Sequence, residues 1–187
     1  PVSCGDVDGD RDLDVFFGGT FQSRSVLLDN DRGKLVMKAA IPETEHSFGD
    51  AKFADVDGDL DLDLILADWG DGNPFDVRGR PRLWINDGGA FVDETDERLP
   101  TSRTGFSWDI EAMDVDGDLD LVLADWGPGN AGGAGGVTKL WLNDGAGSFV
   151  DATVSNMPQV PVSWSWEMDL ADVDNDHDLD VLVSCKT

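Results

Sequence analysis

Residues 55–63 read DVDGDLDLD, a stretch with aspartates at five alternate positions. Carboxylates this close repel one another, because each charge makes ionisation of the next more costly. A hard cation relieves that repulsion, and Ca²⁺ takes about six to eight oxygen ligands from carboxylates and backbone carbonyls. Related stretches are DVDGDRDLD at 6–14, DVDGDLD at 114–120 and DVDNDHDLD at 172–180. One such run is most simply a solvated acidic segment, but four copies, each followed by an apolar run, predict calcium loops.

These loops also account for the charge of the chain. The sequence has 187 residues, 39 acidic and 13 basic, and a formal net charge of -26. The four stretches contain five, five, four and five aspartates, and the remaining acids and bases make an ordinary surface. Binding to nucleic acid is disfavoured, because it requires clustered lysine and arginine, and no such cluster is visible.

Location is inferred from calcium rather than from cysteines. Weak calcium sites fill only where calcium is abundant, which favours a secreted, extracellular or cell-surface protein. The cysteines, Cys4 and Cys185, permit one disulfide and form no metal motif. No apolar run is long enough to span a membrane. The chain begins at Pro1 without an apolar leader, so we expect a mature form, a fragment or the ordered part of a longer protein.

Spacing and periodicity predict a repeated β-structure. The loops begin at residues 6, 55, 114 and 172, and repeats of this size indicate a solenoid or a propeller. Before the third loop, Trp108 and Ile110 alternate with Asp109, a period of two that indicates a strand. Short apolar runs follow the loops at 15–19, 64–68, 121–125 and 181–185, and their β-branched and aromatic residues favour buried strands.

Asn-Asp-Gly or a similar cluster then predicts a hairpin, since these residues tolerate positive φ. The hairpins are expected at 26–39, 83–95 and 139–153. Each repeat thus holds four antiparallel strands, which is the blade of a β-propeller. The prediction is an all-β chain, one propeller segment over 1–187, with blades at about 1–40, 41–95 and 96–153 and half a blade at 160–187.

The segment DVDGDLDLDLILADWG at 55–70, followed by LWINDGGAFVDET at 83–95, resembles the FG-GAP or VCBS repeat of integrin alpha-chain propellers and secreted bacterial proteins. The resemblance covers essentially the whole chain. It implies that loop positions 1, 3, 5 and 9 give side-chain oxygens and position 7 a backbone carbonyl. The implied side-chain ligands are Asp6, Asp8, Asp10, Asp14, Asp55, Asp57, Asp59, Asp63, Asp172, Asp174, Asp176 and Asp180, with main-chain oxygens from Asp12, Asp61 and Asp178.

The loops depart from the family pattern in two ways. The family usually has glycine at position 6, where this chain has Arg11, Leu60, Leu119 and His177, so either the loop bends differently or affinity suffers. The third loop is two residues short, which makes its candidate ligands, Asp114, Asp116, Asp118 and Asp120, the doubtful set among up to four sites. An EF-hand is rejected, because it needs a glutamate at position 12 and flanking helices.

A ligand is expected on the face opposite the loops, where long connections follow the second strands. Trp69, Asn73, Trp126 and Asn130 are the candidate ligand-binding residues, with the rings as stacking platforms for a glycan. The alternative, which we favour, is that Trp69 and Trp126 pack between blades. Trp84 and Trp141, within the third strands, are expected to do so. His46 is expected to be a surface residue, and no catalytic residues are identified.

The sequence therefore predicts a calcium-binding module for adhesion to a glycan or protein, with structural Ca²⁺. One alternative is the propeller domain of a polysaccharide-degrading enzyme, although the chain has no tyrosine. Another is a purely structural module. Since propellers need about four to eight blades, further sequence or a partner chain is expected to complete the ring, and two copies would give seven blades.

Overall fold

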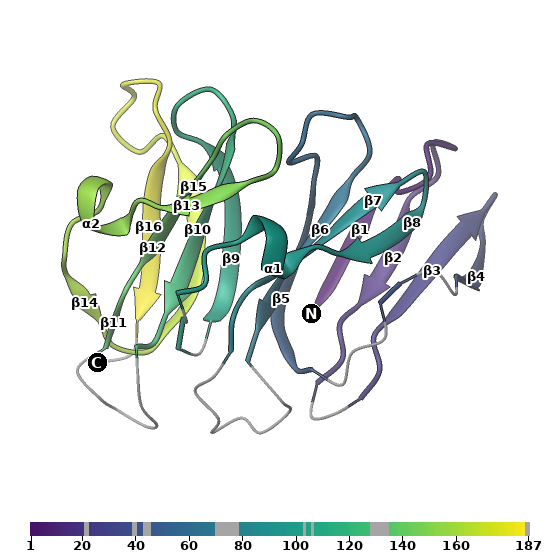
Figure 1. Cartoon of the computed structure of the whole chain (residues 1–187), viewed down its shortest axis with the longest axis horizontal. Coiled ribbons are helices and arrows are strands. Elements are labelled where there is room, and N and C mark those ends of the chain that lie inside the picture. The colour runs from purple at the N-terminus through teal and green to yellow at the C-terminus, as the bar shows by residue number, and fades with distance from the viewer. Residues whose placement is uncertain are drawn as a thin grey trace.

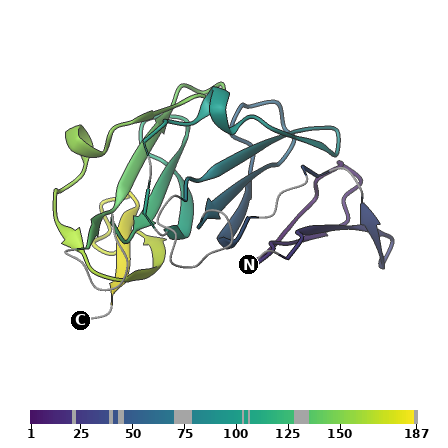
Figure 2. The same ribbon diagram turned by 60° about the horizontal axis from the view of Figure 1, so that its bottom comes forward.

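The chain folds into antiparallel β-sheets that follow one another in an open arc (Figures 1 and 2). A computed structural model of the chain describes residues 1–20, 23–38, 41–42, 46–69, 79–102, 104–105, 107–127 and 135–185. The four acidic loops lie wholly within these ranges, whereas Asn73 and Asn130 lie outside them. The candidate contacts of those two asparagines are therefore not described.

Three sheets have four strands each, and every strand pairs with its neighbour in sequence. We call them blades 1 to 3. Blade 1 contains β1 (Val2–Gly5), β2 (Asp14–Phe17), β3 (Val26–Asp31) and β4 (Lys34–Lys38). Blade 2 contains β5 (Phe48–Ala54), β6 (Asp63–Asp68), β7 (Arg82–Asp87) and β8 (Ala90–Asp93). Blade 3 contains β9 (Ser107–Asp114), β10 (Leu119–Asp125), β12 (Lys139–Asn143) and β13 (Phe149–Asp151).

A fourth sheet, called blade 4, pairs β15 (Ser165–Ala171) with β16 (Asp180–Cys185). The first strands of the four blades, β1, β5, β9 and β15, lie next to one another in that order. The all-β prediction, with four-stranded antiparallel blades and a final two-stranded one, is confirmed. Cys4 on β1 of blade 1 and Cys185 on β16 of blade 4 are both exposed and unbonded.

Short elements that were not predicted connect the blades. Helices α1 (Thr95–Arg98) and α2 (Thr153–Asn156) follow the last strands of blades 2 and 3, and β11 (Gly136–Val137) pairs with β14 (Pro161–Val162). The hydroxyl of Thr95 accepts the backbone N–H of Leu83, and that of Thr153 accepts the N–H of Leu140. These bonds hold each helical turn against the third strand, so the outer strand ends earlier than its sequence pattern indicated.

The core lies between blades rather than within one sheet. Trp84 meets Phe16 of blade 1 and Phe48 of its own blade edge to face, with ring centroids 6.1 Å apart in both pairs. Trp141 lies in the corresponding cluster between blades 2 and 3. Both tryptophans are fully buried, as predicted. Burial of apolar surface between neighbouring sheets therefore holds adjacent blades together.

None of the helices in the described part of the chain has the length and apolar character needed to cross a membrane.

Candidate metal sites

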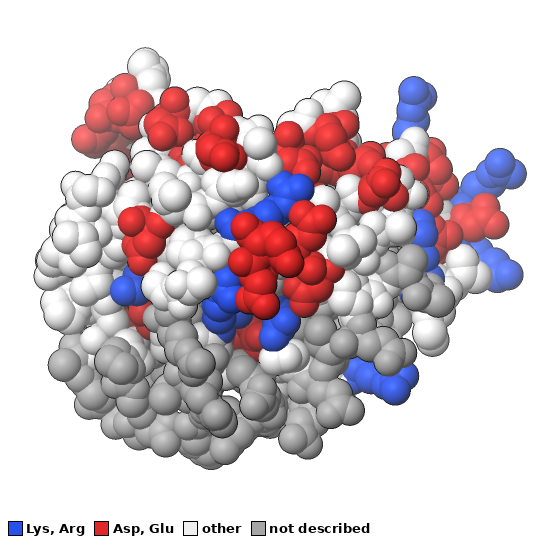
Figure 3. Space-filling model, viewed as in Figure 1, with Lys and Arg blue, Asp and Glu red and all other residues white. Residues whose placement is uncertain are grey.

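The acidic loops join the first and second strands of the blades and lie along one edge of the molecule, the upper edge in Figure 1. Carboxylates gather along the same edge in Figure 3. We call the loops 1 to 4, at residues 6–14, 55–63, 114–120 and 172–180. All four therefore face the same side of the arc.

In loops 1, 2 and 4 the first aspartate folds the loop around its own side chain. The carboxylate of Asp55 accepts the backbone N–H groups of Gly58 and Leu60 at 2.8 and 3.1 Å. Asp6 and Asp172 accept the corresponding pairs of N–H groups. Short polar side chains readily bond to backbone a few residues ahead, which is why this bend forms locally.

In loops 1, 2 and 3 the last aspartate accepts two backbone N–H groups, one from its own loop and one from the third strand. In loop 2, Asp63 Oδ2 accepts the N–H of Val56 at 3.0 Å, and Oδ1 accepts the N–H of Asn86 at 2.9 Å. Asp14 and Asp120 make the same two bonds to the equivalent residues. These three aspartates are at most 1% exposed, so the hairpin of the third and fourth strands encloses the base of the loop.

Three loops bring carboxylates together at metal-binding spacing. One oxygen from each of three aspartates lies within 4.8 Å of the others in the sets Asp6, Asp8 and Asp10; Asp55, Asp57 and Asp63; and Asp172, Asp174 and Asp180. Carboxylate oxygens on a short loop are the donor set that Ca²⁺ prefers, and neighbouring backbone carbonyls can add further oxygens. The residues of loops 1, 2 and 4 therefore fit the ion.

Loop 3 has a different backbone. Asp114 pairs directly with Leu119 in the β9–β10 ladder, so the connection is shorter than in the other loops. Asp116 and Asp118 are exposed, and within this fully described loop no set of three carboxylates meets the same spacing. The two missing residues thus remove the turn that gathers the carboxylates elsewhere.

The residues at loop position 6 adopt the conformation that glycine would favour. Arg11, Leu60 and His177 have φ values of 76°, 79° and 78°. A left-handed residue with a β-carbon costs about 1–2 kcal/mol. Of the two expected outcomes, the loops therefore keep their bend and accept the backbone strain, with Leu119 excepted because it belongs to β10.

Protein cations contact two of the loops, which the sequence did not reveal. Lys38 Nζ lies 2.9 Å from Asp8 and 3.1 Å from Asp29, and Arg98 Nη2 lies 3.5 Å from Asp57. The hydrogen bond from Lys38 lowers the pKa of Asp8. Asp29 comes from β3 and forms a second possible metal set with Asp8 and Asp14. Spacing along the chain could not identify it, because it belongs to the third strand and lies 15 positions after Asp14, outside the acidic loops.

Burial opposes ionisation in loop 2. Desolvation raises the pKa of Asp63 to about 6, although the N–H groups of Asn86 and Val56 act in the other direction. Desolvation, followed by the charge of Asp59, also raises the pKa of Asp57. Without a metal, these carboxylates therefore hold protons more readily than exposed ones do.

The candidate ligand-binding tryptophans belong to an inter-blade cluster at the opposite ends of the strands. Trp69 is 5% exposed, and its Nε1 donates to the carbonyl of Ser107 in the next blade. Trp126 donates in the same way to Ser165. The cluster comprises Trp69, Trp108, Trp126, Trp164 and Trp166. Both rings therefore pack between blades, and Trp166, at 41%, is the exposed member.

His46, expected to be a surface residue, is partly exposed and makes polar contacts on both sides of its ring. Its Nδ1 lies 3.0 Å from the buried Asp68, and Nε2 lies 2.8 Å from Arg82. Since Arg82 can only donate, Nε2 acts as the acceptor and Nδ1–H donates to Asp68. Residues 36 positions apart meet here only through the packing of the blade.

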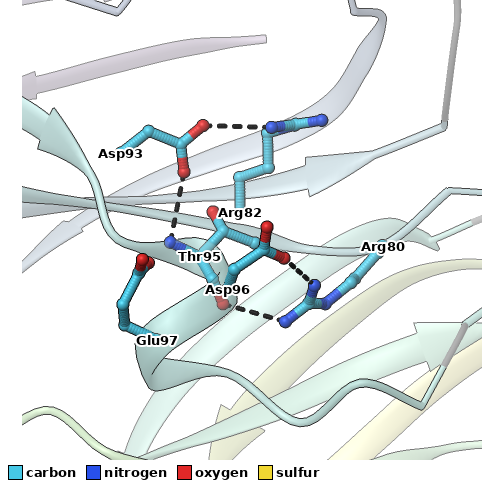
Figure 4. A pocket seen from close by; sticks show the side chains of 6 residues that line it. All are labelled: Arg80, Arg82, Asp93, Thr95, Asp96 and Glu97. Atoms are coloured by element: carbon cyan, nitrogen blue, oxygen red, sulfur yellow. Dashed lines mark hydrogen bonds and ion pairs between the residues drawn. The ribbon is translucent and has the colours of Figure 1, made fainter.

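A pocket beside α1 is lined by charged side chains and one threonine (Figure 4). Arg80 donates to Asp96 and to the carbonyls of Thr95 and Leu99, and Arg82 donates to Asp68 and Asp93. Arg80 thus binds α1, and Arg82 joins the ends of β6 and β8. The lining residues are Arg80, Arg82, Asp93, Thr95, Asp96 and Glu97.

A family model described as an FG-GAP-like repeat matches residues 55–124 and 113–183. A comparison with curated proteins found no match.

Proposed function

Because the chain belongs to the FG-GAP-like repeat family, we propose that it is a β-propeller repeat module stabilised by structural Ca²⁺ in loops 1, 2 and 4. The observation that carries the proposal is the grouping of three carboxylates within 4.8 Å in each of these loops. Bound Ca²⁺ supplies positive charge that offsets the repulsion among the aspartates. Binding would also favour the folded chain, since the ligand geometry exists only when the loop is folded.

The arrangement supports a structural rather than a catalytic metal. The first and last aspartates of each metal loop are fixed by backbone N–H groups, so the ion would join the start of the loop to its end. The two ends of the loop adjoin the first and second strands of a blade. A metal here would therefore hold a strand connection in place.

We further propose that the module acts outside the cell in binding or adhesion to a glycan or protein. FG-GAP-like repeats are typical of extracellular proteins, and abundant calcium there would keep even weak sites filled. Trp166 offers exposed aromatic surface on the side away from the loops. Glycan-array and pull-down screens at millimolar calcium test this part, and a complete lack of captured ligands would contradict it.

Calorimetric titration and thermal unfolding test the metal sites. We expect three equivalents of Ca²⁺ and a higher melting temperature with calcium than with EDTA. Asp57→Asn should reduce the stoichiometry to two, whereas the matched change Asp116→Asn in loop 3 should leave it at three. Unchanged stability in EDTA, together with no binding heat, would refute the proposal.

A further inference from the structure

The hairpin asparagines join neighbouring blades through one side-chain amide. Asn86 Nδ2 donates to the carbonyl of Leu62 in its own loop at 3.1 Å and to that of Val7 in the preceding loop at 2.8 Å. Asn143 Nδ2 donates to Leu119 at 3.1 Å and to Val56, again in the preceding loop, at 2.7 Å. The same bond therefore crosses two successive seams between blades.

Each asparagine is itself held firmly. Asn86 Oδ1 accepts the N–H of Gly89 at 2.8 Å, and its backbone N–H donates to Asp63, the ninth residue of loop 2. Asn143 makes the equivalent bonds to Gly147 and Asp120. The two asparagines are 1% and 8% exposed. A buried side chain bonded at both ends has one position available, so it can transmit the position of one loop to the next.

The carbonyl that receives the cross-blade bond lies between two candidate metal ligands. Val7 stands between Asp6 and Asp8, and its own N–H donates to Asp14 at 3.0 Å. The backbone N–H of Val7 thus bonds to its own blade, and its backbone carbonyl accepts a bond from blade 2. Val56 in loop 2 is held in the same way, by Asp63 and by Asn143.

At each boundary between blades, a hairpin glycine packs closely against a cationic side chain and an aspartate. A β-carbon on Gly89 would lie 3.0 Å from Lys38 Nζ and 3.2 Å from the β-carbon of Asp8. At the next seam, a β-carbon on Gly147 would lie 2.5 Å from Arg98 Nη1 and 3.1 Å from the β-carbon of Asp57. The hairpin of one blade therefore covers the second aspartate of the preceding loop, at loop position 3.

From these contacts we infer that Asn86 and Asn143 are positioning residues that couple Ca²⁺ binding in loops 1 and 2 to docking of the following blade. The inference rests on the proposed calcium sites. Coupling of this kind is reciprocal: a docked hairpin raises the affinity of the preceding loop, and bound Ca²⁺ tightens the seam. Loop affinity is then a property of two adjacent blades.

Asn30 provides a matched control within the same fold. Its backbone N–H donates to Asp14, and its Oδ1 accepts the N–H of Gly33, as in the other two hairpins. Its Nδ2 donates to Leu13 of its own loop, and no cross-blade bond from it occurs among the described residues. Asn30→Ala therefore removes the own-blade contacts alone.

The experiment measures Ca²⁺ affinity of loop 1 by calorimetry in the full chain, with loops 2 and 4 silenced by Asp57→Asn and Asp174→Asn. Asn86→Ala should weaken loop 1 at least about fivefold, the lower end of ordinary coupling between sites. Asn30→Ala shows the effect of losing the bonds within blade 1. A loop-4 background, made with Asp8→Asn and Asp57→Asn, should bind equally well with and without Asn86→Ala.

The outcomes separate the two proposals. Absence of Ca²⁺ binding in the unmodified chain would overturn both. Normal binding there, with loop-1 affinity unchanged by Asn86→Ala or with an equal loss in loop 4, would overturn the coupling alone. In case Asn86→Ala does not fold, NMR of the unmodified chain gives a second measurement: Ca²⁺ should slow exchange of the Asn86 and Asn143 side-chain amide protons more than those of Asn30. Equal slowing at all three asparagines would likewise refute the inference.

Discussion

Asp109 of β9 faces Asp50 of β5, so two carboxyl groups meet at the interface between blades 2 and 3. Asp109 also accepts the N–H of Met168 from blade 4, and Lys52 lies 3.5 Å from Asp50 and 2.9 Å from Glu111. Desolvation, followed by the nearby carboxyl groups of Asp50 and Glu111, raises the pKa of Asp109 to about 7. Inter-blade packing thus holds a proton on an aspartate near neutral pH.

This pair predicts a stability contribution that is lost towards alkaline pH. The folded pKa of Asp109 lies above the unfolded value of about 3.9, so its contribution is fully present below that value and disappears as pH rises through about 7. Asp109→Asn should flatten this part of the profile and be more stable than the unmodified chain at pH 8. Urea unfolding at pH 5 and 8, at constant calcium, measures it. The exposed change Asp87→Asn should leave the profile intact, and an equal effect of both changes would contradict the assignment.

Loop 2 should bind calcium less tightly in acid. The pKa of Asp63 is raised to about 6, and Ca²⁺ requires the ionised carboxylate, so protons compete with the ion below that pH. If calcium binding must displace one proton, the calcium affinity falls by at most about tenfold for each unit by which the pH is lowered. Calorimetry at pH 7.5 and 5 of a chain with loops 1 and 4 silenced gives the value. Equal affinities at the two pH values would show that Asp63 is not a ligand.

Lys38 should partly replace the metal at loop 1, because its ammonium already neutralises Asp8 and Asp29. Lys38→Gln is expected to destabilise the calcium-free chain by up to about 1 kcal/mol, the usual scale of a partly exposed ion pair. The stabilisation gained on adding calcium should increase. Thermal unfolding in EDTA and in calcium measures both. Lys34→Gln on the same hairpin is the control, and a smaller calcium effect in Lys38→Gln would be the contrary result.

Replacing Leu60 with glycine should make the folded chain more stable. It is 88% exposed with φ of 79°, so Leu60→Gly loses little packing and relieves about 1–2 kcal/mol of backbone strain. The greater freedom of the unfolded chain offsets about 0.4–1 kcal/mol of this, which leaves a net gain of up to about 1.6 kcal/mol. Leu119→Gly, at the equivalent position inside β10, should instead destabilise. Urea unfolding at saturating calcium compares the two, and similar losses would contradict the strain argument.

Trp84 should tolerate phenylalanine far better than alanine. The ring is fully buried between blades, and its Nε1 has no hydrogen-bond partner within the described chain. Trp84→Ala should cost about 3–5 kcal/mol through loss of packing. Trp84→Phe should cost less than half as much, because it keeps most contacts and removes an unpaired donor. Chemical denaturation distinguishes them. Equal costs would indicate that Nε1 has a partner, such as an internal water.

Much of the candidate site could be predicted from sequence because its signals are local. The bend of loop 2 forms through bonds from Asp55 to residues three and five positions ahead, and β6 follows directly as an apolar run. The contacts of Asn86, Lys38 and His46 could not be predicted, because their partners are 79, 30 and 36 positions away. The sequence indicated only that Asn86 is a turn residue. That role explains the bond that its Oδ1 accepts from Gly89, but not the bond that its Nδ2 donates to Val7.

The sequence by itself determined the repeated loop, the period-two strands and the Asn-Asp-Gly hairpins, since each depends on interactions within a few residues. It also showed that loop 3 is short. Only the tertiary structure decided that loops 1, 2 and 4 gather carboxylates, that Asp29 and Lys38 join loop 1, and that Trp69 and Trp126 bond to the next blade. The physical reason is that neighbouring blades bury their apolar faces against each other, and this burial places distant polar groups at positions that no local pattern records.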